Sequence, residues 1–275
     1  WTEGVRRVFA VPLIYAVADM INFAFAEWMS VGAIIGFIVY SSGVGLPLTL
    51  VITIVATAVV GLALAEVFFS PMQDAGPIPL LLTSIGLGFI MRHTLVILFG
   101  ADPRFIDAAS GRWEIFGASL YADQFLIIGL AVATMLTVHL MLHRSDVGIA
   151  MRATSDAVDL ASVSGINPRR IRQYVWLIAS GLAGLSGFLL AVQSTASPHT
   201  GFNVILIIIA AAILGGAGSA YGAMAGAYVI GFAITLTGAV LPSGFGALGR
   251  SVAFLALIIV LLARPSGIAD VEVDK

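Results

Sequence analysis

Long apolar runs, separated by short polar segments, dominate the pattern of this chain. A helix that crosses a bilayer needs about 20 consecutive apolar residues. Nine runs approach or reach that length, at residues 8–25, 28–40, 46–69, 79–100, 125–142, 174–192, 203–215, 221–241 and 251–263. The pattern predicts an all-α, polytopic transmembrane helical bundle of about eight or nine membrane segments, folded as a single domain over residues 1–275.

Two of these runs, 28–40 and 203–215, are too short for an ordinary span. Short segments, or segments broken by Gly or Pro, often form discontinuous helices beside a transport pathway. A tilted span or a thin membrane explains the same pattern equally well. Both interpretations stay open.

Composition narrows the class of protein. Hydrophobic residues make up 60% of the chain and charged residues 10%, and the mean hydropathy is +1.06. Soluble domains carry about 25% charged residues. A soluble enzyme, a nucleic-acid binder and a disordered chain are therefore excluded.

The sequence does not contain the residues that several kinds of chemistry require. The sequence contains no cysteine, and its one lysine is Lys275, so a thiol nucleophile and a Walker A lysine are excluded. His139 and His143 share a helix face, but two ligands do not make a zinc site. We expect no catalytic residues, no metal and no cofactor in this chain.

The distribution of arginine predicts the orientation of the chain in the membrane. The segment 143–172 contains Arg144, Arg152, Arg169, Arg170 and Arg172. The segment 100–123 has four acidic residues and only two arginines, Arg104 and Arg112. Because cytoplasmic loops are enriched in Lys and Arg, 143–172 is expected in the cytoplasm. The segment 100–123 is then an external loop, with or without a short hairpin.

Counting spans from this loop places the C-terminus in the cytoplasm. Counting backward places Trp1 outside, together with Arg6 and Arg7. This placement conflicts with the enrichment of Lys and Arg on the cytoplasmic side. Either the first two segments are divided wrongly, or residues before Trp1 contribute another span. Because the chain begins with Trp rather than Met, we expect preceding residues to be missing or processed.

Residues 144–172 form the longest polar stretch, which we interpret as a cytoplasmic loop. Gly165 is suited to the position just after a helix end. Residues suited to start a helix are Ser145 or Asp146, Ser155, and Asn167 followed by Pro168. One side of the second helix is apolar, through Val158, Leu160, Ala161 and Val163. Such an amphipathic helix either lies in the headgroup region or docks into a groove on a soluble partner.

Five segments resemble, in order and spacing, the Liv-type permeases of ABC importers for branched-chain amino acids. They are MINFAFAE at 20–27, TSIGL at 83–87, GIAMRATSDAVDLASVSGIN at 148–167, AILGGAGS at 212–219 and RPSGI at 264–268. Together they extend over nearly the whole chain. Where the family has His-Gly before the acid, this chain has Phe25 and Ala26. The turn after Glu66 lacks the family's arginines, and Asp19 is an additional acid.

The resemblance implies a multi-pass permease subunit in the cell (inner) membrane of a bacterial-type cell. It implies pairing with a second related permease, two cytoplasmic ATPase subunits and an external solute-binding protein, with the lipid bilayer as solvent and no nucleic acid. ATP hydrolysis on the separate ATPases would drive import of a small amino acid, expected to be branched-chain, by alternating access. The coupling helix that contacts an ATPase would include Gly148, Arg152, Ala153, Asp156, Leu160, Ala161, Gly165, Ile166 and Asn167.

Polar and glycine residues in or beside the apolar runs are candidates for the translocation pathway. Because charges at the bilayer centre cost about 2.5–3.5 kcal/mol, they usually face the bundle interior or water. The candidates are Asn22, Glu27, Thr83, Ser84, Gly86, Gly215 and Gly216. Each has a structural alternative, such as a helix end for Glu27 and bonds of the hydroxyls to their own helix.

Regularly spaced glycines are expected to pack helices closely rather than to contact solute. These are Gly218, Gly222 and Gly226, four residues apart, and Gly181, Gly184 and Gly187, three residues apart.

Other functions remain open. An ion-gradient-driven secondary transporter or channel would rely on Asp19 and Glu27 as its only candidate acids. A permease of the same class could import urea, short amides or sugars. A membrane scaffold without transport activity would need no ATPase partner.

Overall fold

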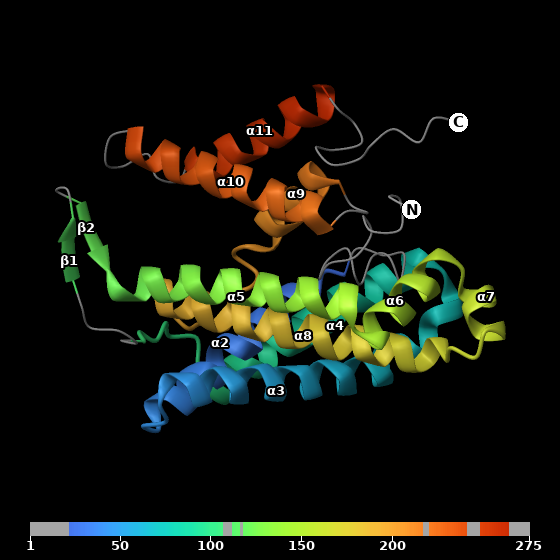
Figure 1. The fold of residues 1–275 in the computed structure, drawn as a ribbon. Coiled ribbons are helices and arrows are strands. Elements are labelled where there is room, and N and C mark those ends of the chain that lie inside the picture. The colour runs from blue at the N-terminus through green and yellow to red at the C-terminus, as the bar shows by residue number, and fades with distance from the viewer. Residues whose placement is uncertain (1–21, 107–111, 116–117, 217–219, 241–247, 264–275) are drawn as a thin grey trace. The chain divides into compact units, whose positions relative to one another are not determined.

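The computed structural model describes residues 22–106, 112–115, 118–216, 220–240 and 248–263, and these are almost entirely helical. The chain divides into two compact units, Asn22–Asn203 and a second one that contains Val204–Lys275 with Trp1–Ile21. Figure 1 shows the elements of both units. The described elements of the larger unit are α2 (Phe25–Ser41), α3 (Leu46–Leu64), a π-helical turn (Ala65–Phe69), a 3-10 turn (Ser70–Ala75), α4 (Pro77–Phe99), β1 (Arg112–Ile115), β2 (Ala118–Tyr121), α5 (Ala122–Arg144), α6 (Asp146–Asp156), α7 (Val158–Val163) and α8 (Pro168–Gln193).

The prediction of an all-α, polytopic membrane protein is confirmed. Four described helical segments are long and apolar enough to cross a membrane: Leu46–Met72, Pro77–Phe99, Gln124–Arg144 and Pro168–Gln193. Shorter apolar helices are Phe25–Ser41, Ile205–Gly215 and Gly222–Gly238. Every apolar run of the sequence after the first coincides with a helix. Most of the first run, 8–25, lies outside the described residues.

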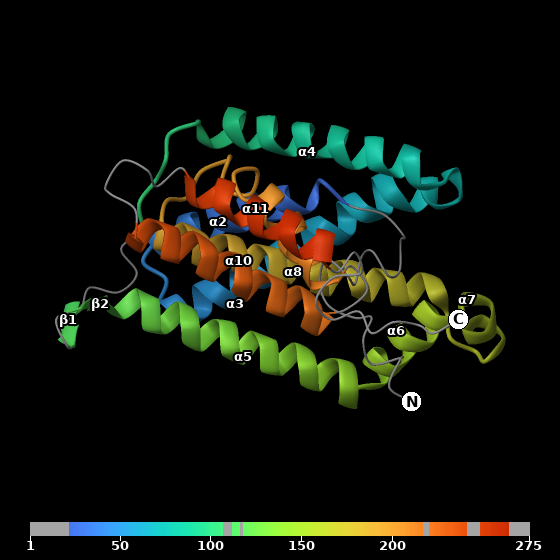
Figure 2. The ribbon, with the colours of Figure 1, turned by 90° about the horizontal axis from the view of Figure 1, so that it is seen from above.

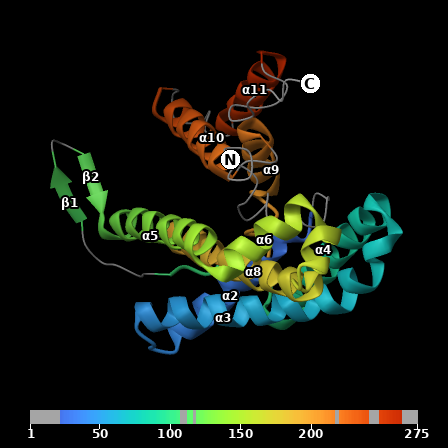
Figure 3. The same cartoon turned by 45° about the vertical axis from the view of Figure 1, so that its right-hand side comes forward.

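A short β-hairpin is the main exception to the helical pattern. Strands β1 and β2 pair antiparallel, with Arg112 opposite Tyr121 and Ile115 opposite Ala118. The hairpin adjoins the N-terminal end of α5, whereas α6 and α7 follow its other end (Figure 3). The two polar segments that the arginine count assigned to opposite sides of a membrane therefore lie at opposite ends of one long apolar helix.

Helices α2, α3 and α8 form the centre of the larger unit, and α4 and α5 flank them (Figure 2). Glycines bring the central helices into backbone contact. A Cβ atom on Gly32 of α2 would overlap the backbone of Gly184, and one on Gly187 would overlap the carbonyl of Met29. In a bilayer, where the hydrophobic effect does not drive helices together, such close approach supplies the packing energy.

The face of α3 that meets α8 carries small and hydroxyl residues at every fourth position. These residues, all buried, are Thr49, Thr53, Thr57 and Gly61. Residues four apart share one face of a helix, so together they make a continuous stripe. A Cβ on Gly61 would overlap Ser180 of α8, and a Cβ on Gly184 would overlap the Thr57 side chain. At Gly61 and Gly184, the contacts between α3 and α8 thus leave no room for an added methyl group.

The smaller unit is described through α9 (Ile205–Gly215), α10 (Ala220–Val240) and α11 (Leu248–Ala263). A buried cluster of Ala210, Ala211, Leu214 and Ile230 forms its core. A Cβ on Gly215 would overlap the backbone of Gly222, and one on Gly226 would overlap the Ala211 carbonyl. Gly222 and Gly226, which we expected to pack helices, thus lie where α9 and α10 touch. Gly218, the third glycine of that prediction, lies outside the described residues.

Candidate functional site

Helix α2 begins beside a point well inside α4 rather than beside one of its ends. The Ala24 amide donates to Asn22 Oδ1 at 2.9 Å, and the Phe23 amide donates to Ser84 Oγ at 3.2 Å. With a rise of about 1.5 Å per residue, Ser84 lies about 10 Å along α4, a helix about 34 Å long. Because α4 is long enough to span a membrane, α2 begins within the thickness that α4 covers. This geometry agrees with the discontinuous-helix interpretation of the run 28–40.

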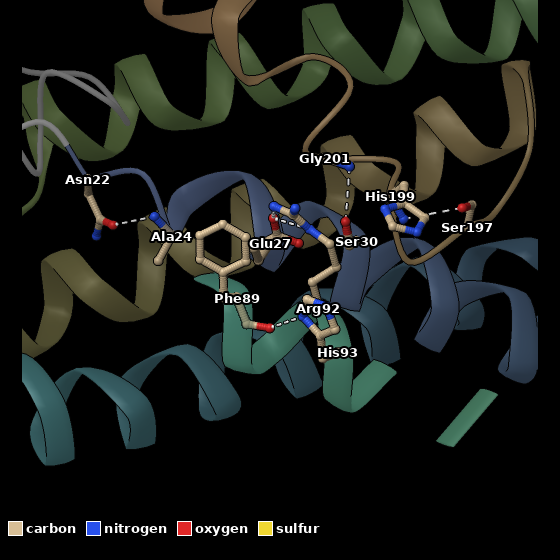
Figure 4. Close-up of polar contacts among 10 residues, drawn as sticks. All are labelled: Asn22, Ala24, Glu27, Ser30, Phe89, Arg92, His93, Ser197, His199 and Gly201. Carbon is tan, nitrogen blue, oxygen red and sulfur yellow. Dashed lines mark hydrogen bonds and ion pairs between the residues drawn. The ribbon is translucent and has the colours of Figure 1, made fainter. Parts of the chain in front are cut away.

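A buried ion pair joins the first turn of α2 to α4. Glu27 is 1% exposed and Arg92 is 9% exposed. Arg92 Nε donates to Glu27 Oε1 at 3.1 Å, and an Arg92 terminal nitrogen donates to the same oxygen. The other carboxylate oxygen, Oε2, is buried and has no hydrogen-bond partner in the described structure. Figure 4 shows the pair together with its surroundings.

Aromatic rings and the segment after α8 enclose the guanidinium of Arg92. The centroid of the Phe202 ring lies 3.8 Å from Arg92 Cζ, and that of Phe89 lies 5.5 Å away. Both distances are within the range of cation–π contacts, which strengthen when water is excluded. The Gly201 amide donates to Ser30 Oγ of α2 at 2.9 Å (Figure 4). These contacts bring the segment after α8 onto the start of α2.

Glycine is required at one position of this enclosure. A Cβ on Gly201 would overlap the carbonyl of Ala26 on the first turn of α2. The bond from Gly201 to Ser30 therefore depends on a residue without a side chain. Glycine lets the segment after α8 approach the backbone of α2 closely enough to cover the ion pair.

The predicted pathway residues fall into separate groups. Asn22, Glu27 and Ser84 meet at the start of α2. Thr83 donates to Pro79 O at 2.8 Å and contacts Met72 Sδ at 3.0 Å. Gly86 is exposed and has no neighbour within 4 Å of an added Cβ. The remaining candidates are Gly215 and Gly216, at the end of α9 in the other unit. Asp19, a candidate acid of the ion-driven alternative, lies outside the described residues.

Arg92 is the residue of this site that sequence analysis missed. Its position was the available signal: with His counted as neutral, it is the one charged residue of the run 79–100, eight residues before its end. Charged residues inside membrane segments usually pair with one another and mark substrate or ion pathways. Glu27 is its partner, 65 residues away in the chain.

The loop between α5 and α8 contains two short helices with well-defined ends. Ser145 starts α6, with its hydroxyl accepting from the Gly148 amide at 3.1 Å. A Cβ on Gly148 would lie 2.6 Å from Leu142 Cα, so glycine permits α6 to fold closely onto the end of α5. The prediction that Ser155 starts the second helix is wrong. Helix α6 continues through Asp156, and the extended residue Ala157 separates it from α7.

The end of α7 and the start of α8 follow the sequence prediction. Gly165 has φ +88°, its amide bonds Ser162 O, and the Ile166 amide bonds Ala161 O, each at 3.0 Å. This is the Schellman arrangement, which a glycine at this position favours. Asn167 Oδ1 then accepts from the Arg169 and Arg170 amides at 3.0 and 3.3 Å.

The apolar residues of α7 divide into one that is buried and three that are not. Ala161 is 4% exposed, whereas Val158, Leu160 and Val163 are 50%, 68% and 87% exposed. The other residues predicted for coupling, Arg152 and Ala153, lie half-buried on α6, and of Asp156 only the backbone is described. The loop thus presents an apolar surface that no described residue of this chain covers.

Glu66 connects the π-helical turn after α3 to the start of α8. Its carboxylate accepts from Arg169 at 3.2 Å and from Gln173 Nε2 at 2.9 Å. The Arg169 side chain is 68% exposed, and exposed ion pairs contribute at most about 1 kcal/mol. The contact therefore orients the loop exit relative to α3 more than it stabilises the fold.

Replacing Asn167 with Ala should lower the free energy of unfolding by about 1 kcal/mol, since two amides at the start of α8 lose their acceptor. Thermal unfolding of the detergent-solubilised chain measures this loss. Ser164→Ala is the matched control, because the exposed Ser164 hydroxyl only bonds back to Leu160 O. Equal destabilisation by the two substitutions would contradict the capping role.

A multi-pass helical chain with a charged pair buried between two of its apolar helices has the features of a membrane transport protein. The described residues contain no cluster of three or more His, Cys, Asp or Glu that could hold a metal ion. The family model "Branched-chain amino acid transport system / permease component" matches residues 8–261, and the chain belongs to this family.

Curated relatives cover most of the chain. LivH of Escherichia coli K12, a high-affinity branched-chain amino acid transport system permease protein, is 29% identical over 96% of this chain and 90% of its own. BraD of Pseudomonas aeruginosa, a permease protein described in the same words, shows the same identity and coverage. A probable branched-chain amino acid transport permease protein LivH of Methanocaldococcus jannaschii is 28% identical over 96% of this chain and 88% of its own. No solved structure matches.

Proposed function

We propose that this chain is the membrane-spanning permease subunit of an ATP-driven ABC importer, which moves a branched-chain amino acid into the cytoplasm by alternating access. The observation that carries the proposal is the family match over residues 8–261. The relatives named for branched-chain amino acid transport support the solute class. ATP would be hydrolysed on two separate cytoplasmic subunits, and this chain would catalyse no reaction.

The same proposal includes a second related permease and an external binding protein that delivers the solute. It places the complex in the inner membrane of a bacterial-type cell, with the α6–α7 loop in the cytoplasm. The separation of the α5–α8 loop and the hairpin by one long apolar helix supports this orientation. The arginines near the loop support it independently.

The α6–α7 loop would be the element that contacts an ATPase. Support comes from the exposed side chains of Val158, Leu160 and Val163, which suit an apolar groove on a partner. The loop is also attached firmly at both ends, at α5 through Gly148 and at α8 through Asn167. Force applied to α7 by a moving ATPase would therefore reach α8 with little loss to local flexibility.

Leu160→Asp should weaken binding of the ATPase subunits by at least tenfold. A buried Leu contributes about 1.5–3 kcal/mol, and 1.4 kcal/mol corresponds to a factor of ten in affinity. Co-purification of epitope-tagged complexes in mild detergent, followed by titration of ATPase subunits onto the purified permease pair, measures the effect.

Ser162→Asp is the matched control, because it places the same charge at another exposed position of α7. It should retain the ATPase at wild-type level. Wild-type co-purification of an ATPase and a sister permease, with loss of only the ATPase from Leu160→Asp, supports the importer. A chain that purifies without any ATPase, under conditions that preserve other transporter complexes, contradicts it and favours the ion-driven transporter.

A further inference from the structure

We propose that Glu27 and Arg92 bind the charged head group of the transported amino acid. Glu27 would hold the α-ammonium group and Arg92 the α-carboxylate, after α4 separates from the start of α2. The inference rests on the proposed function, which supplies a zwitterionic solute. It assigns the two charges of that solute to two residues that now neutralise each other.

The contacts of α4 differ in kind from those within the α2–α3–α8 core. Gly32, Gly184 and Gly187 place backbone against backbone between α2 and α8. Between α2 and α4, by contrast, a Cβ on Gly88 would find Glu27 Cγ at 3.6 Å and Ala24 Cα at 3.7 Å, which are ordinary contacts. Polar bonds hold α4 here instead, through Ser84 and Arg92. Helix α4 can therefore leave α2 without disturbing the glycine contacts of the core.

Charge balance points to a zwitterion as the group that enters. Separation of α4 alone would leave a carboxylate and a guanidinium unpaired in a dry environment, which is strongly unfavourable. A ligand that carries one positive and one negative charge replaces both partners at once. The net charge of the site then stays unchanged, and each charge keeps an opposite neighbour.

The Glu27–Arg92 pair does not use all of its hydrogen-bonding capacity, so a solute can form more hydrogen bonds with the two residues than they form with each other. Arg92 bonds only one oxygen of Glu27, and the buried Oε2 atom lacks a donor. An ammonium group has three N–H donors and can serve both oxygens of a carboxylate. A guanidinium binds a free carboxylate best through two parallel bonds, one to each oxygen. Both charges thus gain hydrogen bonds when the solute takes the partner's place.

The surroundings also suit an amino acid. The start of α2 is a helix N-terminus, which favours a carboxylate nearby. Phe89 and Phe202 flank Arg92 and offer apolar surface to an aliphatic side chain. These residues and the ion pair all belong to the larger unit.

The absence of cysteine from the sequence allows the movement of α4 to be tested by cross-linking. Ala24→Cys with Gly88→Cys places two thiols within disulfide range, because a Gly88 Cβ would lie 3.7 Å from Ala24 Cα. In the complete importer in proteoliposomes, with binding protein and ATP, oxidation should reduce uptake of radiolabelled leucine at least tenfold. A reductant should restore it.

The matched control links two helices of the core. Ala58→Cys with Gly181→Cys joins α3 to α8, where the two Cβ atoms would lie 3.5 Å apart. Oxidation of this pair should leave uptake within twofold of the reduced sample, and the single-cysteine variants report any effect of the substitutions themselves. Unchanged uptake with α4 fully cross-linked to α2 would overturn the proposed separation.

The charges themselves are tested in the same importer by Glu27→Gln together with Arg92→Gln, which removes both charges and leaves neither unpaired. If they bind the solute, leucine uptake should fall at least tenfold, while ATP hydrolysis stimulated by the binding protein persists. The single variant Arg92→Lys keeps the positive charge beside an unchanged Glu27. It should therefore show more leucine uptake than the doubly neutral variant. A purely structural ion pair would instead lower uptake and ATP hydrolysis together, in proportion to the amount of assembled complex.

The outcomes separate this inference from the proposed function. If the assembled wild-type complex imports leucine, and the doubly neutral variant does so with unchanged KM and unchanged coupling to ATP hydrolysis, the inference fails and the importer stands. If the wild-type complex imports no branched-chain amino acid, the proposed function itself fails, and the assignment of Glu27 and Arg92 fails with it.

Discussion

Replacing Arg92 with Met should lower the free energy of unfolding by about 3–5 kcal/mol, one of the largest single-residue effects we expect. The substitution keeps an unbranched, apolar side chain against the rings of Phe89 and Phe202 but removes the charge. Glu27, only 1% exposed, then keeps a buried carboxylate without its cation. Thermal and denaturant unfolding of the detergent-solubilised chain, followed by loss of helical signal, measures the change.

The double variant Glu27→Leu with Arg92→Met distinguishes the charge effect from lost packing. Replacing both members of a buried ion pair with apolar residues is often neutral or stabilising. We therefore expect the double variant to regain most of the stability that Arg92→Met loses. Equal destabilisation of the two variants would show that packing around Arg92, rather than an unpaired carboxylate, causes the loss.

An apolar pair at positions 27 and 92 would hold α4 against α2 without the desolvation cost of two buried charges. Stability alone therefore does not account for Glu27 and Arg92. Buried charges within membrane proteins are usually functional, which agrees with their assignment to solute binding.

The apolar pattern predicted the helices well because each span must satisfy its own backbone within a bilayer. The ends of the short helices between α5 and α8 could also be predicted, since Ser145, Gly165 and Asn167 act on amides and carbonyls a few residues away. Ser155 shows the limit of this local reasoning. A serine is equally compatible with a position inside α6, where the structure places it, because nothing nearby ends the helix before Asp156.

Contacts between distant segments could not be predicted in the same way. The sequence offered Glu27 as a candidate, but its partner lies 65 residues away and depends on how α4 rests against α2. The buried threonines of α3 were hidden for the same reason. Thr53 and Thr57 look like ordinary polar interruptions of an apolar run, yet both are 0% exposed where α3 meets α8. Only the packing of helices distinguishes such positions from lipid-facing ones.

Helix α8 connects the two regions to which we assign function. Its first turn is fixed by Asn167 at the exit of the proposed coupling loop. Further along, Gly184 and Gly187 join it to α2, the helix that carries Glu27. Because these contacts are backbone to backbone, α8 and α2 should move as one body when an ATPase acts on α7. Helix α4, held by polar bonds, is then the element expected to shift relative to them.

The packing of α2 against α8 depends on Gly187, and Gly187→Val should be among the most damaging apolar substitutions in the described part of the chain. A Cβ there would overlap the carbonyl oxygen, the carbonyl carbon and the Cα of Met29. These are backbone atoms, which cannot rotate away. Helices α2 and α8 would have to separate, and the neighbouring contact of Gly32 with Gly184 would be lost as well. Overpacking of a core costs about 1–3 kcal/mol where side chains adjust, and we expect at least about 3 kcal/mol here, because only backbone can move.

Gly129→Val is the matched control, since Gly129 is also a helical glycine but is exposed on α5, with nothing within 4 Å of an added Cβ. Both variants add the same three carbons to an apolar helix, so any effect of Val on helix formation is shared. Yield of folded chain in detergent and its unfolding midpoint should fall sharply for Gly187→Val and remain near wild type for Gly129→Val. If Gly187→Val unfolds like Gly129→Val, α2 and α8 are not held by backbone contact, and their proposed movement as one body loses its physical basis.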